Sequence, residues 1–144
     1  MARSQGPAGP RAFLIALTPE SQRALGAAEI EITEFPFRVG RESRAGHRVA
    51  PRVIAERRKA EVRTNNEIYL SESSEPFNVS REHLQIEHNG TQYILTDRQS
   101  TCGTLVEGRQ VGGQHVGGAV PLRDGDVIIV GTSASRYVFK FRAR

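Results

Sequence analysis

Short segments in which apolar and polar residues alternate recur along almost the whole chain of 144 residues. A period of two puts the apolar side chains on one face of an extended backbone, so each segment predicts a half-buried β-strand. The clearest segment is 83–88, where Leu84 and Ile86 share a face and Asn89-Gly90 supplies a hairpin turn. The expected strands lie at 12–17, 28–33, 35–39, 67–70, 83–88, 91–96, 104–106, around Val116, and at 119–122, 127–130 and 137–141.

About ten to eleven short strands with frequent turn signals and almost no helical period predict an all-β fold, an antiparallel β-sandwich. The length fits one domain with a buried core, which we place at 12–142. Residues 1–11 hold little to bury and predict a flexible N-terminal arm. Residues of about 42–66 form a long Arg-rich insert between early strands, and its structure stays open because few apolar residues would anchor a helix there.

Composition argues against several classes of protein. The single cysteine excludes an intramolecular disulfide, and the four histidines lack the spacing of a zinc site, so we expect no metal and no cofactor. The longest apolar runs, 12–17 and 127–130, are too short to cross a bilayer. No apolar stretch precedes Ala12, so we expect no secretory signal, no membrane partner and a cytoplasmic location.

The charge favours an anionic partner. The net charge is +4, and arginine supplies 18 of the 20 basic residues. The excess is local, because the stretch 38–63 holds nine basic residues against three acidic ones. The planar guanidinium of arginine suits forked contacts with phosphate.

Four short fragments stand at the ends of predicted strands, where several loops could converge. Each fragment is weak alone, but together they combine an arginine, small hydroxyl residues and glycine turns, which are groups that hold an anion. We therefore predict an anion-binding rim. The fragments are Gly40-Arg41, Ser-Arg-Glu-His at 80–83, Ser-Thr-Cys-Gly-Thr at 100–104 and Leu-Arg-Asp-Gly-Asp at 122–126.

With this ordered set, the chain from about residue 35 to residue 141 resembles the forkhead-associated (FHA) domain family. The resemblance implies a β-sandwich of the FHA/SMAD-like type that acts as a non-catalytic, phosphothreonine-binding signalling module. The implied partner is a phosphothreonine-containing protein or peptide, and hence a Ser/Thr kinase pathway. We expect the domain to be monomeric.

The resemblance also assigns roles to individual positions. It places Arg41 and Ser80 at the phosphate, with Thr101 adding a hydroxyl from the facing loop. Arg81 follows Ser80 and is expected to add a second positive charge. The implied structural support of the site comes from Gly40, His83 and Gly103.

Cys102 departs from the family pattern, which commonly has asparagine before this glycine to hold the peptide main chain. A thiol is a poorer hydrogen-bond donor than an amide. Three interpretations stay open: a neutral loss with weaker peptide binding, a small buried residue in an altered turn, and a reactive thiol.

Two other functions are considered, and the first of them stays open as an alternative. The arginines of the insert could contact nucleic acid or an acidic protein while the phosphate site is degenerate. An enzyme would need Ser80, His83 and Asp97 as a hydrolytic trio, or Cys102 as nucleophile. Ser80 and His83 are only three residues apart and no nucleophile-elbow pattern surrounds them, so we expect no enzyme activity.

Overall fold

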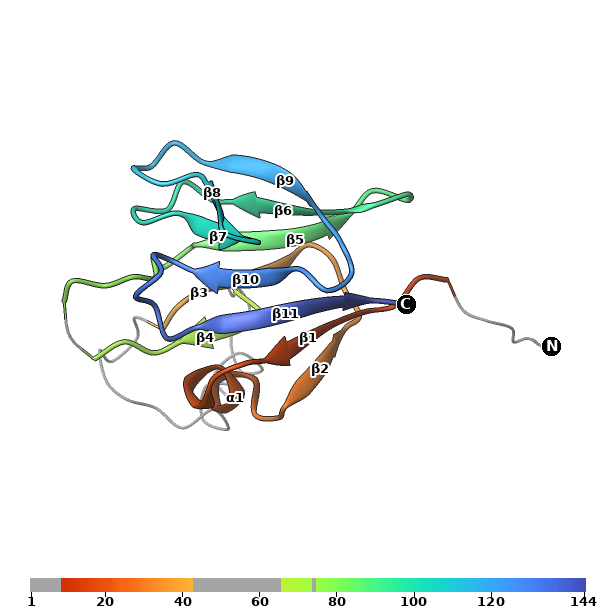
Figure 1. The fold of residues 1–144 in the computed structure, drawn as a ribbon, viewed down its shortest axis with the longest axis horizontal. Helices are drawn as coiled ribbons and strands as arrows, with labels where there is room; N and C mark the ends of the chain where they lie inside the picture. Colours follow the sequence, from red (N-terminus) through yellow and green to blue (C-terminus); the bar gives the residue numbers. More distant parts are fainter. Residues whose placement is uncertain (1–8, 43–65, 74) are drawn as a thin grey trace.

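The computed structural model describes residues 9–42, 66–73 and 75–144. Within these ranges the chain forms eleven strands and one short helix (Figure 1). Most of the predicted N-terminal arm and nearly all of the predicted insert lie outside the described residues. The elements are β1 (Ala12–Ala16), α1 (Pro19–Leu25), β2 (Glu29–Ile32), β3 (Phe37–Arg41), β4 (Ile68–Leu70), β5 (Leu84–His88), β6 (Tyr93–Asp97), β7 (Thr104–Val106), β8 (Arg109–Val111), β9 (Gly118–Leu122), β10 (Val127–Val130) and β11 (Val138–Ala143).

The strands form two sheets, so the predicted β-sandwich is confirmed (Figure 1). The order is β2-β1-β11-β10-β7-β8 in the six-stranded sheet and β4-β3-β5-β6-β9 in the five-stranded sheet. Among the described strands every pair is antiparallel except β3 with β4, which run parallel. Parallel neighbours need a long connection, which the chain between β3 and β4 provides.

The core follows from the alternation in the sequence. In β6 the side chains of Tyr93, Leu95 and Asp97 are buried, while Ile94 and Thr96 between them are only partly buried. In β11 the rings of Phe139 and Phe141 are buried, as the sequence predicts. Burial of apolar area at both inner faces holds the sheets together.

The helix α1 is absent from the sequence-based prediction. Thr18 is its N-cap and accepts a hydrogen bond from the Ser21 amide, Pro19 occupies the first turn, and Gly26 ends the helix at a φ of 76°. These are ordinary start and stop signals. The helix has only seven residues, too few to show a helical period, and within the described residues no helix is long and apolar enough to span a bilayer.

The strand predicted around Val116 is wrong. The chain forms β8 at Arg109–Val111 instead, and Val116 lies in the following turn with 75% of its surface exposed. Gln114 and His115 in that turn have φ values of 54° and 63°. This left-handed backbone cannot continue a strand.

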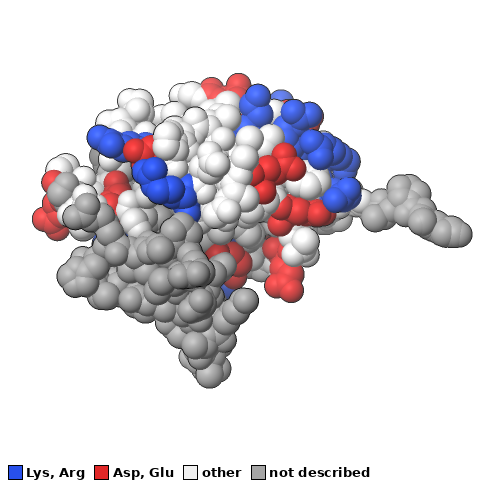
Figure 2. Space-filling model, turned by 90° about the horizontal axis from the view of Figure 1, so that it is seen from below, with Lys and Arg blue, Asp and Glu red and all other residues white. Residues whose placement is uncertain are grey.

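The predicted basic character concentrates in a stretch that the structure largely leaves undescribed. On the face drawn in Figure 2, basic and acidic side chains are interspersed over the described surface. Among the described residues, Arg11 forms an ion pair with Glu31 at 3.0 Å and Arg38 forms one with Glu67 at 2.6 Å. The proposed role of the insert in nucleic-acid or protein binding therefore stays a prediction.

The register of the five-stranded sheet brings three chain segments to one end. Val39 pairs with Leu84, and Leu84 pairs with Asp97. The end of β3 at Arg41, the segment 80–83 before β5 and the loop after β6 therefore meet at the same edge. The predicted rim fragments from these segments are thus neighbours in space.

Replacement of Ile86 by alanine should lower the free energy of unfolding by about 2–5 kcal/mol, because Ile86 is fully buried between the sheets. Ile94 on the neighbouring strand faces outward and is only partly buried, so Ile94→Ala should cost less than about 1 kcal/mol. Urea unfolding of both variants measures the difference. Equal losses would contradict the described register of β5 and β6.

Candidate functional site

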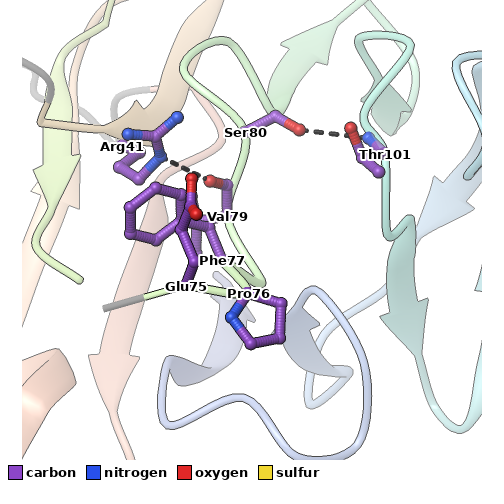
Figure 3. A pocket seen from close by; sticks show the side chains of 7 residues that line it. All are labelled: Arg41, Glu75, Pro76, Phe77, Val79, Ser80 and Thr101. Carbon is purple, nitrogen blue, oxygen red and sulfur yellow. Dashed lines mark hydrogen bonds between the residues drawn. The ribbon is translucent and has the colours of Figure 1, made fainter. Parts of the chain in front are cut away.

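A pocket of about 570 Å³ lies at the end of the five-stranded sheet where the three segments meet (Figure 3). Its volume is in the usual range for ligand pockets. Three of the residues assigned from the resemblance, Arg41, Ser80 and Thr101, line it together. The complete lining is Arg41, Glu75, Pro76, Phe77, Val79, Ser80 and Thr101.

Arg41 is held in a fixed position by two contacts. Its Nε donates a hydrogen bond of 2.9 Å to the Val79 carbonyl, and its guanidinium carbon lies 4.1 Å from the centre of the Phe77 ring (Figure 3). Within the described residues the two terminal nitrogens of Arg41 make no hydrogen bond. A cation fixed over an aromatic face keeps its remaining donors available for a forked contact with an oxyanion.

Ser80 and Thr101 face each other across the rim. The Thr101 amide donates to the Ser80 hydroxyl oxygen at 3.0 Å, as Figure 3 shows. Because Ser80 Oγ is the acceptor here, its own proton remains available to a ligand. Thr101 is exposed, and its hydroxyl lies 3.5 Å from Nε2 of His115.

His83 connects the two loops that carry these hydroxyl groups. Its side chain is fully buried, its Nδ1 accepts a 2.9 Å hydrogen bond from the Ser80 amide, and its Nε2 lies 2.7 Å from the Gly103 carbonyl. The Ser80 amide can only donate, so the ring is neutral with its proton on Nε2, which donates to Gly103. Burial lowers the pKa of the His83 imidazole below its ordinary value.

Asp97 organises the loop that bears Thr101, a role that the sequence analysis missed. Its carboxylate accepts hydrogen bonds from the Ser100 amide at 2.9 Å, the Ser100 hydroxyl at 2.7 Å and the Thr104 hydroxyl at 2.9 Å. Ser100 Oγ in turn accepts from the Gly103 amide at 2.9 Å, and Gly103 has a φ of 82°. An Asp that ends a strand three residues before a Ser is a sequence signal for such a turn.

Gly40 is required by a close approach of backbone. A Cβ at this position would lie 2.0 Å from the Arg81 carbonyl oxygen and 2.6 Å from Nδ2 of Asn66. The same Asn66 amide donates to that carbonyl at 2.8 Å. The glycine thus lets the segment after Val79 pack directly against β3, beside Arg41.

The described part of the loop between β4 and β5 is held by hydrogen bonds within the loop and with Thr132. The Glu72 carboxylate accepts from the amides of Asn78 at 3.1 Å and Val79 at 2.8 Å. The Asn78 side-chain oxygen accepts from the Thr132 hydroxyl at 2.6 Å. These bonds fix the backbone that places Phe77 under Arg41, and no sequence motif marks this arrangement.

Two residues assigned from the resemblance do not line the pocket. Arg81 is exposed, and its carbonyl is the group that packs against Gly40. Cys102 is partly buried and its Sγ donates to the Phe77 carbonyl at 3.5 Å. This geometry favours the interpretation of Cys102 as a partly buried residue of the turn.

The geometry does not present a hydrolytic trio. The two His83 nitrogens are engaged by the main chain at Ser80 and Gly103, and the Ser80 hydroxyl accepts from the Thr101 amide. Asp97 lies 3.9 Å from His83 Nε2 and bonds instead to its own loop. In the described part of the chain no three His, Cys, Asp or Glu side chains gather in a way that could hold a metal ion.

The native protein should lose stability as the pH falls through the titration of His83. Its native pKa lies below the ordinary value of 6.5, so the unfolded chain takes up this proton at a higher pH than the native chain does. The contribution of His83 to the free energy of unfolding is therefore complete above pH 6.5, and it declines as the pH falls from there toward the native pKa. A His83→Asn variant should be less stable by about 1–3 kcal/mol at neutral pH, because one buried bond is lost.

Urea unfolding of both proteins between about pH 8 and pH 5 tests this expectation. The two proteins differ only at residue 83, so the contributions of all other groups cancel in the comparison. The variant should show the shallower decline of unfolding free energy toward acid pH. Parallel declines would contradict the described role of His83.

The model of the FHA domain family matches residues 37–131, well over half of the chain. No curated protein matches significantly.

Solved FHA structures share the fold. The FHA domain of Rv0020c has 22% sequence identity and a TM-score of 0.60, with 98% of this chain and 100% of that chain covered. The kinase-interacting FHA domain of the kinase associated protein phosphatase of Arabidopsis has 20% identity and a TM-score of 0.57, with 93% of each chain covered.

A third similar structure is Mycobacterium tuberculosis EmbR in complex with a low affinity phosphopeptide. It has 23% identity and a TM-score of 0.56; the match covers 92% of this chain but only 24% of the EmbR chain. The matched family model extends from β3 through β10 and includes all three segments that build the pocket. This chain belongs to the FHA domain family.

Proposed function

We propose that this domain binds phosphothreonine-containing peptides, with the phosphate held by Arg41, Ser80 and Thr101. The observation that carries the proposal is the position of Arg41, which is fixed by Phe77 and Val79 in the same pocket as the two hydroxyl residues. Two similar structures support it: EmbR was solved with a phosphopeptide, and another FHA structure comes from work on phosphothreonine-dependent FHA interactions.

The chemistry of the pocket matches the ligand. A phosphothreonine brings a charge of about −1.5 to −2 and three acceptor oxygens. Charge-assisted hydrogen bonds contribute roughly 1.5–3 kcal/mol each, so three of them are consistent with micromolar binding, about −8 kcal/mol, after ordering costs. Because Arg41 is already fixed in the free domain, little entropy is lost when the phosphate binds.

The proposal extends to the setting of the domain. The phosphothreonine partner implies a Ser/Thr protein kinase that modifies it, and we place the domain as a monomeric, cytoplasmic signalling module without catalytic activity. Arg81 and Cys102 then act at the edge of the site, where Arg81 offers a second positive charge.

Isothermal titration calorimetry with phosphothreonine peptides from a library, each paired with its unphosphorylated form, tests the function. The wild-type domain should bind the phosphorylated form and give little or no heat with the other. Arg41→Ala should weaken binding about 10- to 100-fold, since one charge-assisted contact of roughly 1.5–3 kcal/mol is lost.

Arg123→Ala is the matched control. Arg123 is exposed and follows Leu122, which pairs with Tyr93 at the end of β6 opposite to the pocket. The Arg123→Ala variant loses the same positive charge as Arg41→Ala but at the opposite end of the sheet, so its affinity for the phosphorylated peptide should be nearly that of the wild-type domain. Equal affinity of the wild-type domain for both peptide forms, or equal losses in the two variants, would overturn the proposal.

A further inference from the structure

The pocket carries a second charge besides that of Arg41. Of its seven lining residues only Arg41 and Glu75 have an acidic or basic side chain. Glu75 is exposed, and within the described residues its carboxylate makes no hydrogen bond or ion pair. In the view of Figure 3 its side chain extends from the loop toward Phe77 and Arg41.

Glu75 differs in this respect from Glu72 in the same loop. The Glu72 carboxylate is fully engaged by the amides of Asn78 and Val79 and serves to shape the loop. Glu75 has no such structural task in the described structure. Its carboxylate is therefore available to a ligand.

The position of Glu75 is set by the same contacts that build the anion site. Phe77, two residues further on, lies under the Arg41 guanidinium and its carbonyl accepts from Cys102 Sγ. A negative charge on this loop opposes the approach of a dianion to Arg41. A ligand that also carries a positive group removes the repulsion and gains an ion pair.

We propose that Glu75 selects phosphothreonine peptides with an arginine or lysine side chain close in sequence to the phosphothreonine. This proposal rests on the proposed function and adds the class of partner. The phosphate lies against Arg41, Ser80 and Thr101, and the cationic side chain of the peptide lies against Glu75, which lines the same pocket. The protein kinase that phosphorylates the partner is then one that modifies a threonine close in sequence to basic residues.

The expected effect is modest because Glu75 is exposed. Exposed ion pairs contribute about 0.2–1 kcal/mol, so a correctly placed basic residue should raise the affinity roughly two- to fivefold. Salt should reduce the preference, since exposed pairs are screened.

The test uses the tightest phosphothreonine peptide from the library. Each flanking position is replaced in turn by Arg, Gln or Glu, and affinities for the full chain are measured by calorimetry at low and high salt. For the wild-type protein at least one position should rank Arg above Gln and Gln above Glu. The Glu75→Gln variant should lose this ranking and bind the Gln peptide as well as or better than wild type, and Glu75→Arg should reverse it.

Glu34→Gln is the matched control, because Glu34 is exposed before β3, at the end of that strand opposite to Arg41. It should keep the wild-type ranking. If the wild-type protein ranks the peptides equally, or Glu75→Gln keeps the ranking, the selection by Glu75 is overturned while phosphate recognition stands. If no phosphorylated peptide binds better than its unphosphorylated form, both proposals fall together.

Discussion

The site depends on one buried neutral imidazole. His83 joins the amide of Ser80 to the carbonyl of Gly103. Ser80 lies in the loop before β5 and Gly103 in the loop after β6, and these two strands are paired with each other. An imidazole with one acceptor and one donor nitrogen suits this bridge, because the two main-chain groups are of opposite kind. Without it, the Ser80 amide and the Gly103 carbonyl would lose their partner, and the distance between the hydroxyl of Ser80 and the Thr101 amide would no longer be fixed.

Around this bridge each further group is held by a different device. Because Gly40 has no side chain, the backbone of Arg81 can pack directly against β3. This close packing places Arg41 beside the loop between β4 and β5. Phe77 and the Val79 carbonyl then fix the guanidinium. The result is a cation whose free donors are oriented before any ligand arrives, which is how a small, solvent-exposed site can bind an anion with useful affinity.

The sequence predicts the sandwich well because the alternation of apolar residues directly determines which face of each strand is buried. The resemblance to the FHA family points to Arg41, Ser80 and Thr101, and the strand register brings these three residues to one pocket. Phe77 and Glu75 could not be predicted, because their contact with the site depends on the path of an irregular loop. The helix α1 was not predicted because its two turns are too short to show a helical period. The strand around Val116 was predicted wrongly because the pattern of apolar residues does not reveal the left-handed backbone of Gln114 and His115 just before it.

The most direct test of the account is an amide and guanidinium chemical-shift titration of the ¹⁵N-labelled chain with a phosphothreonine peptide and with its unphosphorylated form. We predict that only the phosphorylated peptide moves signals, and that the largest changes fall on the backbone amides of Ser80 and Thr101 and on the Nε–H of Arg41. The result that would contradict it is a set of changes centred on the opposite end of the sheets, at the Asn89-Gly90 turn, or an identical response to both peptides.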